Sequence, residues 1–395
     1  MKAKTLLSFL VIILLVACQE KPVSPDTPYI IEGELTGVKD GLEITLFQFD
    51  GDVGSLLAKD TIQGGKFFFK EQMSDPELNV LMVYVSDDDF PSAGRRIYTA
   101  PGAHIKVKGH DSRIMSWSVE SLVPEQKDYD ALNAIPEYEV LQDLIMAFGR
   151  TINELNSVDR ETEKERYAEV RNRYSSINNQ LDSTYSIYYD KVMDKMMGMK
   201  PSQPFMRTLK MLSSYSNSMP DRVNPEKAKA IYQSLPDDIK QSIEGMTIYG
   251  NLYPPKQAMD GDDFPDADFY DLNGNLHHIA EHKGKYILLD FWSSGCGPCI
   301  KAFPEMKEMY EKYGERLAII SMSIDTERRW RKASEEHDIT WSNWSEGKGE
   351  GGIYANYRVV GIPYYVLINP DGKIEKQIMG YREGQFKKLF SEVFD

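Results

Sequence analysis

The residues with the clearest capacity for chemistry in this chain are two cysteines, Cys296 and Cys299, separated by Gly297 and Pro298. The chain has 3 cysteines in 395 residues, and the third, Cys18, lies near the N-terminus. Two thiols at this spacing can hold part of a metal site, attach a haem, reduce a peroxide or exchange electrons with the disulfides of other proteins. The neighbouring residues discriminate between these chemistries.

The residues around the pair give little support to a metal or haem site. A structural zinc site needs four ligands, of which the pair supplies two, and His277, His278 and His282 show no clear ligand spacing. Covalent haem attachment needs a histidine directly after the second cysteine, where this chain has Ile300. We therefore expect no metal and no cofactor other than a redox-active disulfide.

A peroxide-reducing cysteine has part of its motif here. Ser293 lies three residues before Cys296, as a peroxiredoxin motif requires, but Leu289 occupies the position of the motif's proline. Because the expected loop is incomplete, a thioredoxin-fold peroxidase stays as an alternative function.

The elements predicted around the pair suit a reactive thiol. The apolar run Tyr286–Trp292 predicts a buried strand, and the spacing after Cys296 predicts a helix to about Tyr313. Free amide N–H groups at a helix N-terminus favour an anion, and CxxC cysteines in that position have a lowered pKa. Cys299 lies one helical turn further on, where it can resolve a mixed disulfide.

Strands and helices alternate from about residue 259 to residue 395, which predicts an α/β domain with a parallel-containing sheet covered by helices on both faces. Further buried strands are expected at Leu317–Ile324 and Tyr364–Ile368, and a helix at Arg328–Glu336.

Two different patterns precede this domain. Short apolar or alternating runs between turn residues predict an antiparallel β-sandwich of unknown function over residues 29–120. Apolar residues at spacings of three and four predict a helical region over residues 121–250. The chain is therefore expected to be a multidomain protein.

The N-terminus has the pattern of an export signal. A basic start and an apolar run occupy residues 1–17, and the run is shorter than the about 20 residues that span a bilayer. The run leads into Cys18 in a sequence that resembles the lipobox of bacterial lipoproteins. This resemblance implies a cleaved signal peptide over residues 1–17, lipidation of Cys18 and a polar tether over residues 18–28. Because Gln19 is not the aspartate that commonly retains lipoproteins at the inner membrane, we expect a lipid anchor on the periplasmic side, with the outer membrane favoured.

The charge of the chain argues against one class of partner. The formal net charge is −15, and an acidic protein repels phosphate backbones, so we expect no nucleic-acid partner.

Three motifs together resemble those of the thioredoxin family: Asp290-Phe291-Trp292, Cys296-Gly297-Pro298-Cys299, and Gly361-Ile362-Pro363 before a strand. Residues 259–395 are similar to the thiol-disulfide oxidoreductases of the periplasmic cytochrome-maturation type. The resemblance implies a thioredoxin-like fold and an extracytoplasmic enzyme that acts on protein disulfides. The preceding residues resemble the uncharacterised β-plus-helical region found before such domains in Gram-negative lipoproteins, which brings no known activity.

The resemblance implies a role for each residue that matches the motifs. Cys296 would be the nucleophile and Cys299 the resolving thiol, so the Cys296–Cys299 disulfide is the expected redox group. Asp290 matches the buried carboxylate that manages protons beneath the second cysteine, because burial raises the pKa of such a group towards neutrality.

The same resemblance implies a substrate-binding surface. Pro363 matches the cis-proline that faces the disulfide, and together with Ile362 it would offer backbone to a bound substrate strand. Trp292 would pack against the active-site loop and contribute to this surface.

Three positions depart from the relatives. Gly295 lies where thioredoxin has a tryptophan, Ser321 where thioredoxin has a lysine near the buried aspartate, and Ala302 where cytochrome-maturation relatives often have a glutamate. These differences predict an altered docking surface and altered proton handling, and they weaken a narrow role in haem maturation.

The Gly-Pro pair between the cysteines resembles that of reducing family members, whose potentials lie nearer about −270 mV than about −120 mV. We therefore expect a reductase that a membrane electron-donor thiol reductase keeps reduced. The alternative from another class is a partner-binding lipoprotein in which residues 29–250 recognise the partner and the thioredoxin-like domain is an accessory.

Overall fold

The computed structural model describes residues 24–50, 53–73, 79–87, 90 and 94–395. Cys18 and the predicted signal peptide lie outside the described residues. Among the helices of the described ranges, none combines the length and the apolar character that a membrane crossing requires.

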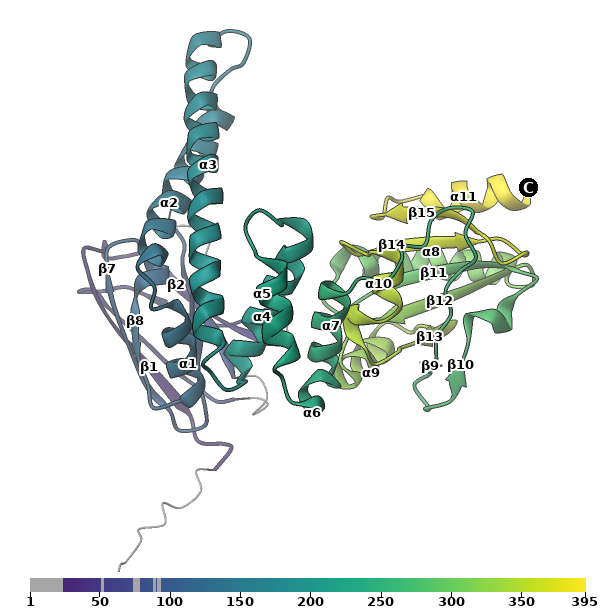
Figure 1. The fold of residues 1–395 in the computed structure, drawn as a ribbon, viewed down its shortest axis with the longest axis horizontal. Coiled ribbons are helices and arrows are strands. Elements are labelled where there is room, and N and C mark those ends of the chain that lie inside the picture. Colours follow the sequence, from purple (N-terminus) through teal and green to yellow (C-terminus); the bar gives the residue numbers. More distant parts are fainter. Residues whose placement is uncertain (1–23, 51–52, 74–78, 88–89, 91–93) are drawn as a thin grey trace, which may run out of the picture.

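The N-terminal part forms two four-stranded sheets (Figure 1). The first has the order β4-β1-β7-β8, with strands at Lys66–Glu71, Tyr29–Thr36, His104–His110 and Ser118–Glu120. The second has the order β3-β2-β5-β6, with strands at Val53–Thr61, Glu43–Asp50, Val80–Val85 and Arg95–Tyr98. Alternate residues of both sheets, such as Ile31, Ile105, Leu46 and Val83, are buried in one hydrophobic cluster, as the period of two in a strand requires.

The prediction of a wholly antiparallel arrangement is wrong at one strand pair. Strand β1 pairs antiparallel with β4 but parallel with β7, with Ile31 opposite Ile105. Parallel neighbours need a long crossover connection, and here the chain between β1 and β7 passes through the whole second sheet. The sequence pattern does not reveal this pairing, because a strand has the same period in either orientation.

The middle part is helical, as predicted. Its helices are α1 (Pro124–Asn133), α2 (Pro136–Ser157), α3 (Lys164–Met196), α4 (Gln203–Ser218), α5 (Pro225–Gln233), α6 (Asp237–Lys240) and α7 (Ile243–Leu252). Helices α2 and α3 form a long hairpin that extends away from the rest of the molecule (Figure 1). Leu141 on α2, and Leu181 and Tyr188 on α3, are buried in a core shared with α4, α5 and α7.

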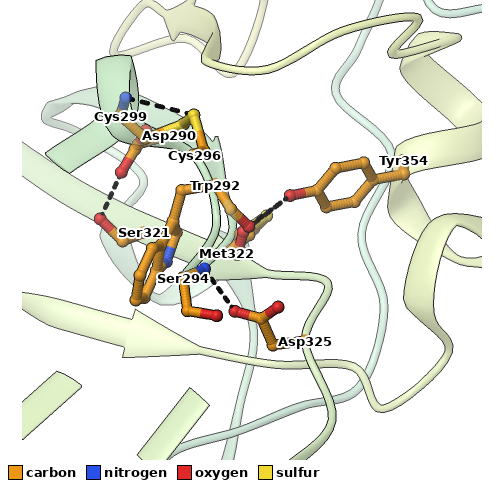
Figure 2. The surroundings of a disulfide bond; sticks show 9 residues. All are labelled: Asp290, Trp292, Ser294, Cys296, Cys299, Ser321, Met322, Asp325 and Tyr354. Atoms are coloured by element: carbon orange, nitrogen blue, oxygen red, sulfur yellow. Dashed lines mark hydrogen bonds between the residues drawn. A yellow bond between two sulfur atoms is a disulfide. The ribbon is translucent and has the colours of Figure 1, made fainter. Parts of the chain in front are cut away.

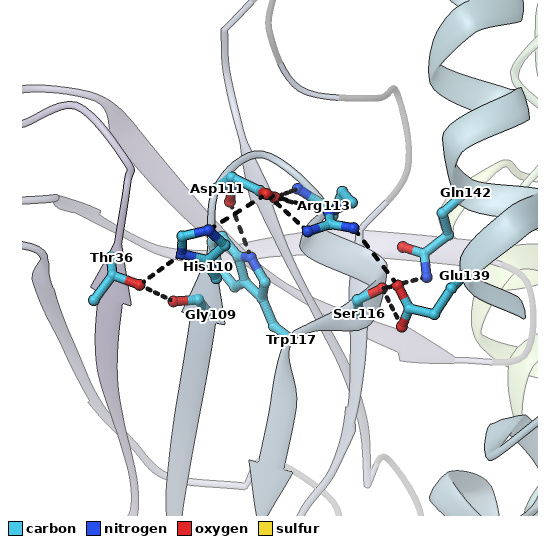
Figure 3. A network of polar contacts seen from close by, with 9 residues as sticks. All are labelled: Thr36, Gly109, His110, Asp111, Arg113, Ser116, Trp117, Glu139 and Gln142. Carbon is cyan, nitrogen blue, oxygen red and sulfur yellow. Dashed lines mark hydrogen bonds and ion pairs between the residues drawn. The ribbon is translucent and has the colours of Figure 1, made fainter. Parts of the chain in front are cut away.

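A polar network joins the first sheet to the helical part (Figure 3). The short 3₁₀ helix η1 (Ile114–Ser116) follows β7, and the Ser116 hydroxyl donates to the Glu139 carboxylate of α2 at 2.9 Å. Gln142 donates a hydrogen bond to the same Ser116 oxygen. The Nε and Nη2 groups of Arg113 both donate to the Asp111 carboxylate. The hydrogen bonds of this network link the segment after β7 to α2 and so hold the first sheet to the helical part.

The C-terminal part contains a five-stranded sheet of order β13-β12-β11-β14-β15 and a two-stranded hairpin of β9 and β10. The predicted buried strands are confirmed, and the elements are β9 (Phe269–Tyr270), β10 (Leu276–His277), β11 (Tyr286–Trp292), α8 (Gly297–Tyr313), β12 (Leu317–Ser323), α9 (Glu327–Glu336), β13 (Ser342–Trp344), α10 (Ile353–Tyr357), β14 (Tyr364–Ile368), β15 (Ile374–Met379) and α11 (Gln385–Phe394). Strands β11, β12 and β13 are parallel, whereas β14 and β15 are antiparallel additions. Residues of α8, α9 and α11 pack in the core on one face and residues of α10 in the core on the other.

Helix α7 touches the C-terminal part through the 3₁₀ helix η3 (Gly349–Gly351), which lies in the insertion between β13 and β14. Two glycines allow the backbones to meet: a Cβ added at Gly351 would lie 2.0 Å from the carbonyl oxygen of Met246, and one added at Gly250 would lie 2.8 Å from the Cα of Gly351. Helix α10, directly after η3, carries Tyr354, whose hydroxyl donates to the Trp292 and Met322 carbonyls at the ends of β11 and β12.

Candidate functional site

The two cysteines of the CxxC motif form a disulfide at the point where a loop leads into helix α8 (Figure 2). Their Cα atoms are 5.2 Å apart. Cys296 is the N-cap residue, and its sulfur accepts a hydrogen bond from the Cys299 amide at 3.2 Å, while Pro298 lies in the first turn. Cys296 is 7% exposed and Cys299 is 0% exposed, so Cys296 is the more accessible of the two residues.

The buried carboxylate of Asp325 holds the loop before Cys296, a contact that the sequence analysis did not predict. The Asp325 Oδ2 atom accepts from the Ser294 amide at 2.6 Å, and Arg329 bridges the Asp325 carboxylate at 3.3 Å and the Ser294 hydroxyl at 2.9 Å. Asp325 lies just before Thr326, the N-cap of helix α9, and Arg329 follows four residues later in the first turn of that helix. That spacing of an acid and a base was visible in the sequence, but nothing in it indicated contact with the cysteine loop.

Asp290 lies completely buried in the middle of the sheet. Its Oδ2 atom accepts a hydrogen bond from the Ser321 hydroxyl at 2.7 Å, and within the described residues its Oδ1 atom has no hydrogen-bond partner. Burial raises the pKa of Asp290 from 3.8 to about 7, and the Ser321 hydrogen bond opposes part of this rise. A carboxyl group with such a pKa can take up and release a proton near neutral pH.

The peptide bond between Ile362 and Pro363 is cis, as the family resemblance implied. The Pro363 carbonyl accepts a hydrogen bond from the Gly380 amide at 2.8 Å, which leaves Ile362 as the residue expected to offer backbone to a substrate. Ile362 is half-buried against the cores on both faces of the sheet, and the nearby Val360 is 86% exposed.

Trp292 has no exposed surface, so it supports the site from below and offers no direct contact to a substrate in this structure. Its ring packs edge-on against Phe303 of α8, with ring centres 5.2 Å apart, and belongs to the same core as both cysteines. Of the three departures from the relatives, Gly295 is exposed beside the disulfide, whereas Ala302 and Ser321 are buried.

Two of the three histidines considered as metal ligands pack on one tryptophan. The His277 ring stacks on Trp344 with ring centres 4.9 Å apart, and His282 stacks on the same tryptophan at 5.7 Å. Trp344 belongs to β13, an edge strand of the five-stranded sheet, so both rings pack against that edge.

Comparison with known proteins adds the following findings. Residues 261–377 match the AhpC/TSA family. The chain is 32% identical over 139 residues to thiol-disulfide oxidoreductase ResA of Bacillus thuringiensis subsp. konkukian, covering 34% of this chain and 79% of the relative. It is 28% identical over 137 residues to thioredoxin-like protein YneN of Bacillus subtilis, covering 33% of this chain and 78% of the relative. A solved structure, the thioredoxin domain of a thiol-disulfide oxidoreductase from Bacteroides vulgatus, matches with 29% identity and a TM-score of 0.32, covering 35% of this chain and 99% of that one.

The residues that match the AhpC/TSA family, 261–377, contain the disulfide, the strand that carries Asp290 and the cis-proline. Because 34% of the chain reproduces 79% of a named thiol-disulfide oxidoreductase at 32% identity, this protein is an enzyme that belongs to the thioredoxin-like thiol-disulfide oxidoreductases.

Proposed function

We propose that the protein reduces protein disulfides outside the cytoplasm through Cys296 and Cys299. One observation carries the proposal: the disulfide lies at a helix N-terminus, Cys296 is more accessible than the fully buried Cys299, and the buried carboxyl group of Asp290 lies on the adjoining strand face. The more accessible cysteine, Cys296, suits attack on a foreign disulfide, and the fully buried Cys299 suits an internal second step.

The reaction starts from the reduced dithiol. The α8 amide that now donates to the Cys296 sulfur favours the thiolate of this residue, which attacks one sulfur of the substrate disulfide. The substrate S–S bond breaks, one substrate thiolate leaves, and a mixed disulfide forms with Cys296. Cys299 then gives its proton to Asp290 and attacks Cys296, so that the internal disulfide forms and the second substrate thiolate leaves. Two electrons pass from the protein to the substrate.

In this proposal the residues around the cis-proline contact the substrate. Ile362 would offer its backbone to an extended substrate segment, in the manner of strand addition to a sheet edge. Gly295, which is exposed beside the disulfide, gives a flatter surface than the tryptophan of thioredoxin would.

The primary test is reduction of insulin disulfides in the presence of dithiothreitol. Cys296→Ser should abolish activity, and Cys299→Ser should accumulate mixed disulfides because the second step cannot occur. Undiminished reduction by Cys296→Ser would sink the proposal.

We also propose that the electrons flow from the protein to the substrate, and that a membrane thiol reductase restores the dithiol. A reductant should equilibrate with a thiol buffer well below about −200 mV, whereas a value near about −120 mV would reverse the direction. The buried Asp290 and the Gly-Pro pair support the lower value.

The location is proposed from the N-terminal sequence. A lipid on Cys18 would anchor the protein to a membrane, with the outer membrane favoured, and the tether would hold residues 29–120, the proposed β-sandwich, and residues 121–250 away from it. Globomycin should accumulate the precursor. If Cys18→Ala still fractionates with membranes as the wild type does, this anchor is wrong.

Two alternatives have distinct tests. The match to the AhpC/TSA family favours one of them, a thioredoxin-fold peroxidase, which should consume hydrogen peroxide with Cys296 as the attacking residue. The other is a partner-binding lipoprotein, which should retain its partner in a Cys296→Ser/Cys299→Ser variant. Trapping substrates on Cys299→Ser would separate the proposed reductase from both.

A further inference from the structure

Three buried polar side chains lie in a row behind the disulfide: Trp341, Ser321 and Asp290. The Trp341 indole Nε1–H donates to the Ser321 hydroxyl oxygen at 2.9 Å, and the Ser321 hydroxyl is hydrogen-bonded to the Asp290 Oδ2 atom at 2.7 Å. Strands β11 and β12 bring Asp290 and Ser321 directly opposite each other. Trp341 arrives from the turn before β13.

The chemistry of the three groups fixes the direction of the row. An indole N–H can only donate, so the Ser321 oxygen accepts from Trp341 and its single hydrogen points to Asp290. Successive hydrogen bonds of this kind strengthen one another in a dry interior. The two Asp290 oxygens are therefore unequal: Oδ2 is hydrogen-bonded, and Oδ1 has no partner among the described residues.

Asp290 faces the cysteines. Successive side chains of a strand point to opposite faces, so Asp290 shares its face with Leu288 and Trp292. Both of these residues belong to the core that contains Cys296 and Cys299. Figure 2 shows the Asp290 carboxyl between Ser321 and the start of α8.

We propose that Ser321, held by Trp341, is a positioning residue that keeps Asp290 Oδ2 occupied and reserves Oδ1 as the atom that takes the proton of Cys299. This inference rests on the proposed reductase and deepens it. In the resolving step the Cys299 S–H bond breaks and the proton moves to Oδ1. The new Cys299–Cys296 bond forms, and the second substrate sulfur leaves as a thiolate. Asp290 then returns the proton to solvent.

The role predicts how loss of the hydroxyl changes the reaction. The hydroxyl stabilises the ionised form of Asp290, which is the form that accepts the proton. Without this hydrogen bond the carboxyl ionises at higher pH, so fewer molecules are ready to react at neutral pH. A lysine, which thioredoxin has at this position, would act by charge, whereas Ser321 acts through one directed hydrogen bond.

The test follows the resolving step alone as a function of pH. The reduced protein is mixed with 5,5′-dithiobis(2-nitrobenzoate), which forms a mixed disulfide on Cys296. Attack by Cys299 then releases a second thionitrobenzoate, and the rate of this second release is measured from acidic to alkaline pH. The variants are Asp290→Asn, Ser321→Ala, Ser321→Thr and Trp341→Phe.

Ser321→Ala should move the midpoint of the pH profile upward by about one unit, because a hydrogen bond to a charged group is lost. The rate at neutral pH then falls by up to about tenfold. Ser321→Thr should restore most of the wild-type profile, since it keeps a hydroxyl. Trp341→Phe should shift the midpoint in the same direction by less, because the Ser321 hydroxyl becomes free to rotate.

A matched control removes a buried hydroxyl elsewhere. Ser213 of α4 is buried and donates to the Lys210 carbonyl, far from the disulfide in the helical part, so Ser213→Ala should leave the midpoint unchanged. If Ser321→Ala and Trp341→Phe keep the wild-type midpoint while Asp290→Asn flattens the profile, the inference is wrong and the proposed proton role of Asp290 stands. If Asp290→Asn keeps the wild-type profile, both are wrong.

Discussion

Two regions of the molecule bury a charged side chain in different surroundings. At the joint between the N-terminal sheets and the helices, Arg95 is 5% exposed, pairs with Asp130 of α1 and donates to the Met115 carbonyl. Next to it the Gln126 side chain accepts from the Tyr98 amide at 2.8 Å. In the C-terminal domain, Asp290 is buried with one oxygen satisfied and one without a partner. The buried charge at the joint is paired with a charge of opposite sign, although Arg95 Nε has no hydrogen-bond partner among the described residues, whereas Asp290 is hydrogen-bonded by a neutral hydroxyl.

A second carboxylate in the C-terminal domain shows that the difference is not a property of the domain as a whole. Glu305 of α8 is buried, and it accepts from the amides of Gly384, Phe386 and Lys387 and from the Tyr381 hydroxyl. The three amides belong to the N-terminal end of α11, so Glu305 fastens that helix to the domain. A buried acid with a full set of donors holds elements together, and one with a reserved oxygen is available for proton transfer.

The largest effect on stability should come from Asp290→Asn, measured by urea unfolding of the oxidised protein at different pH values. Below pH 3.8 both folded and unfolded wild type hold the Asp290 proton; between there and about pH 7 only the folded protein keeps it. Stability of the wild type should therefore fall as pH rises through this window, by about 4 kcal/mol in total.

Asp290→Asn should lose this slope and be more stable than the wild type above neutral pH. The exposed Asp237→Asn serves as the control and should keep the slope. If the Asp290→Asn variant has the same pH dependence as the wild type, Asp290 is ionised in the folded protein, and the contrast with the joint disappears.

The next effect should come from the joint. Asp130→Ala leaves the buried Arg95 cation without its carboxylate, which should lower the free energy of unfolding by about 3 kcal/mol. The pH midpoint of the resolving step should not move, because this pair joins the N-terminal sheets to α1 and lies outside the C-terminal domain. A shifted midpoint would show that the joint and the site are coupled.

A smaller effect should come from the contact between α7 and η3. Gly351→Ala places a methyl group against the Met246 carbonyl and should cost about 2 kcal/mol in thermal or urea unfolding. Gly149 of α2 is the matched control, since an added Cβ meets nothing within 4 Å there. Gly149→Ala should stabilise by up to about 1 kcal/mol. If Gly351→Ala and Gly149→Ala change the unfolding free energy equally, the contact between α7 and η3 does not hold the helical part to the C-terminal domain.

The smallest effect should come from an exposed ion pair on the same helix as Glu305. Glu308 and Lys387 are 2.8 Å apart with both side chains 55% exposed, so Glu308→Gln should leave the unfolding free energy within experimental error. Glu305→Gln in the same assay should be clearly destabilising, because a buried acceptor of several hydrogen bonds is altered. If the two variants are equally stable, completeness of hydrogen bonding does not explain the role of Glu305.

Local sequence determined much of the C-terminal domain. The apolar runs at Tyr286–Trp292 and Tyr364–Ile368 match β11 and β14 in both bounds, and the helix begins at the cysteine pair as predicted. Strands and helices produce side-chain patterns with periods of two and 3.6 residues, and turn residues mark their ends. Both signals lie within short stretches of sequence, so these elements could be predicted locally. The CxxC spacing likewise determines that the two sulfurs meet across one helical turn.

Tertiary structure decided which side chains meet across long stretches of chain. The parallel pairing of β1 with β7, the hold of Asp325 on Ser294 and the row from Trp341 to Asp290 join residues that no local pattern relates. Asp290 within an apolar run predicts a buried carboxyl group, but not which of its oxygens is occupied. That distinction depends on Ser321 and Trp341, which reach it only once the parallel strands have paired and the turn before β13 has folded over them. The sequence thus predicts which residues react, and the packed sheet sets the environment that makes the two Asp290 oxygens unequal.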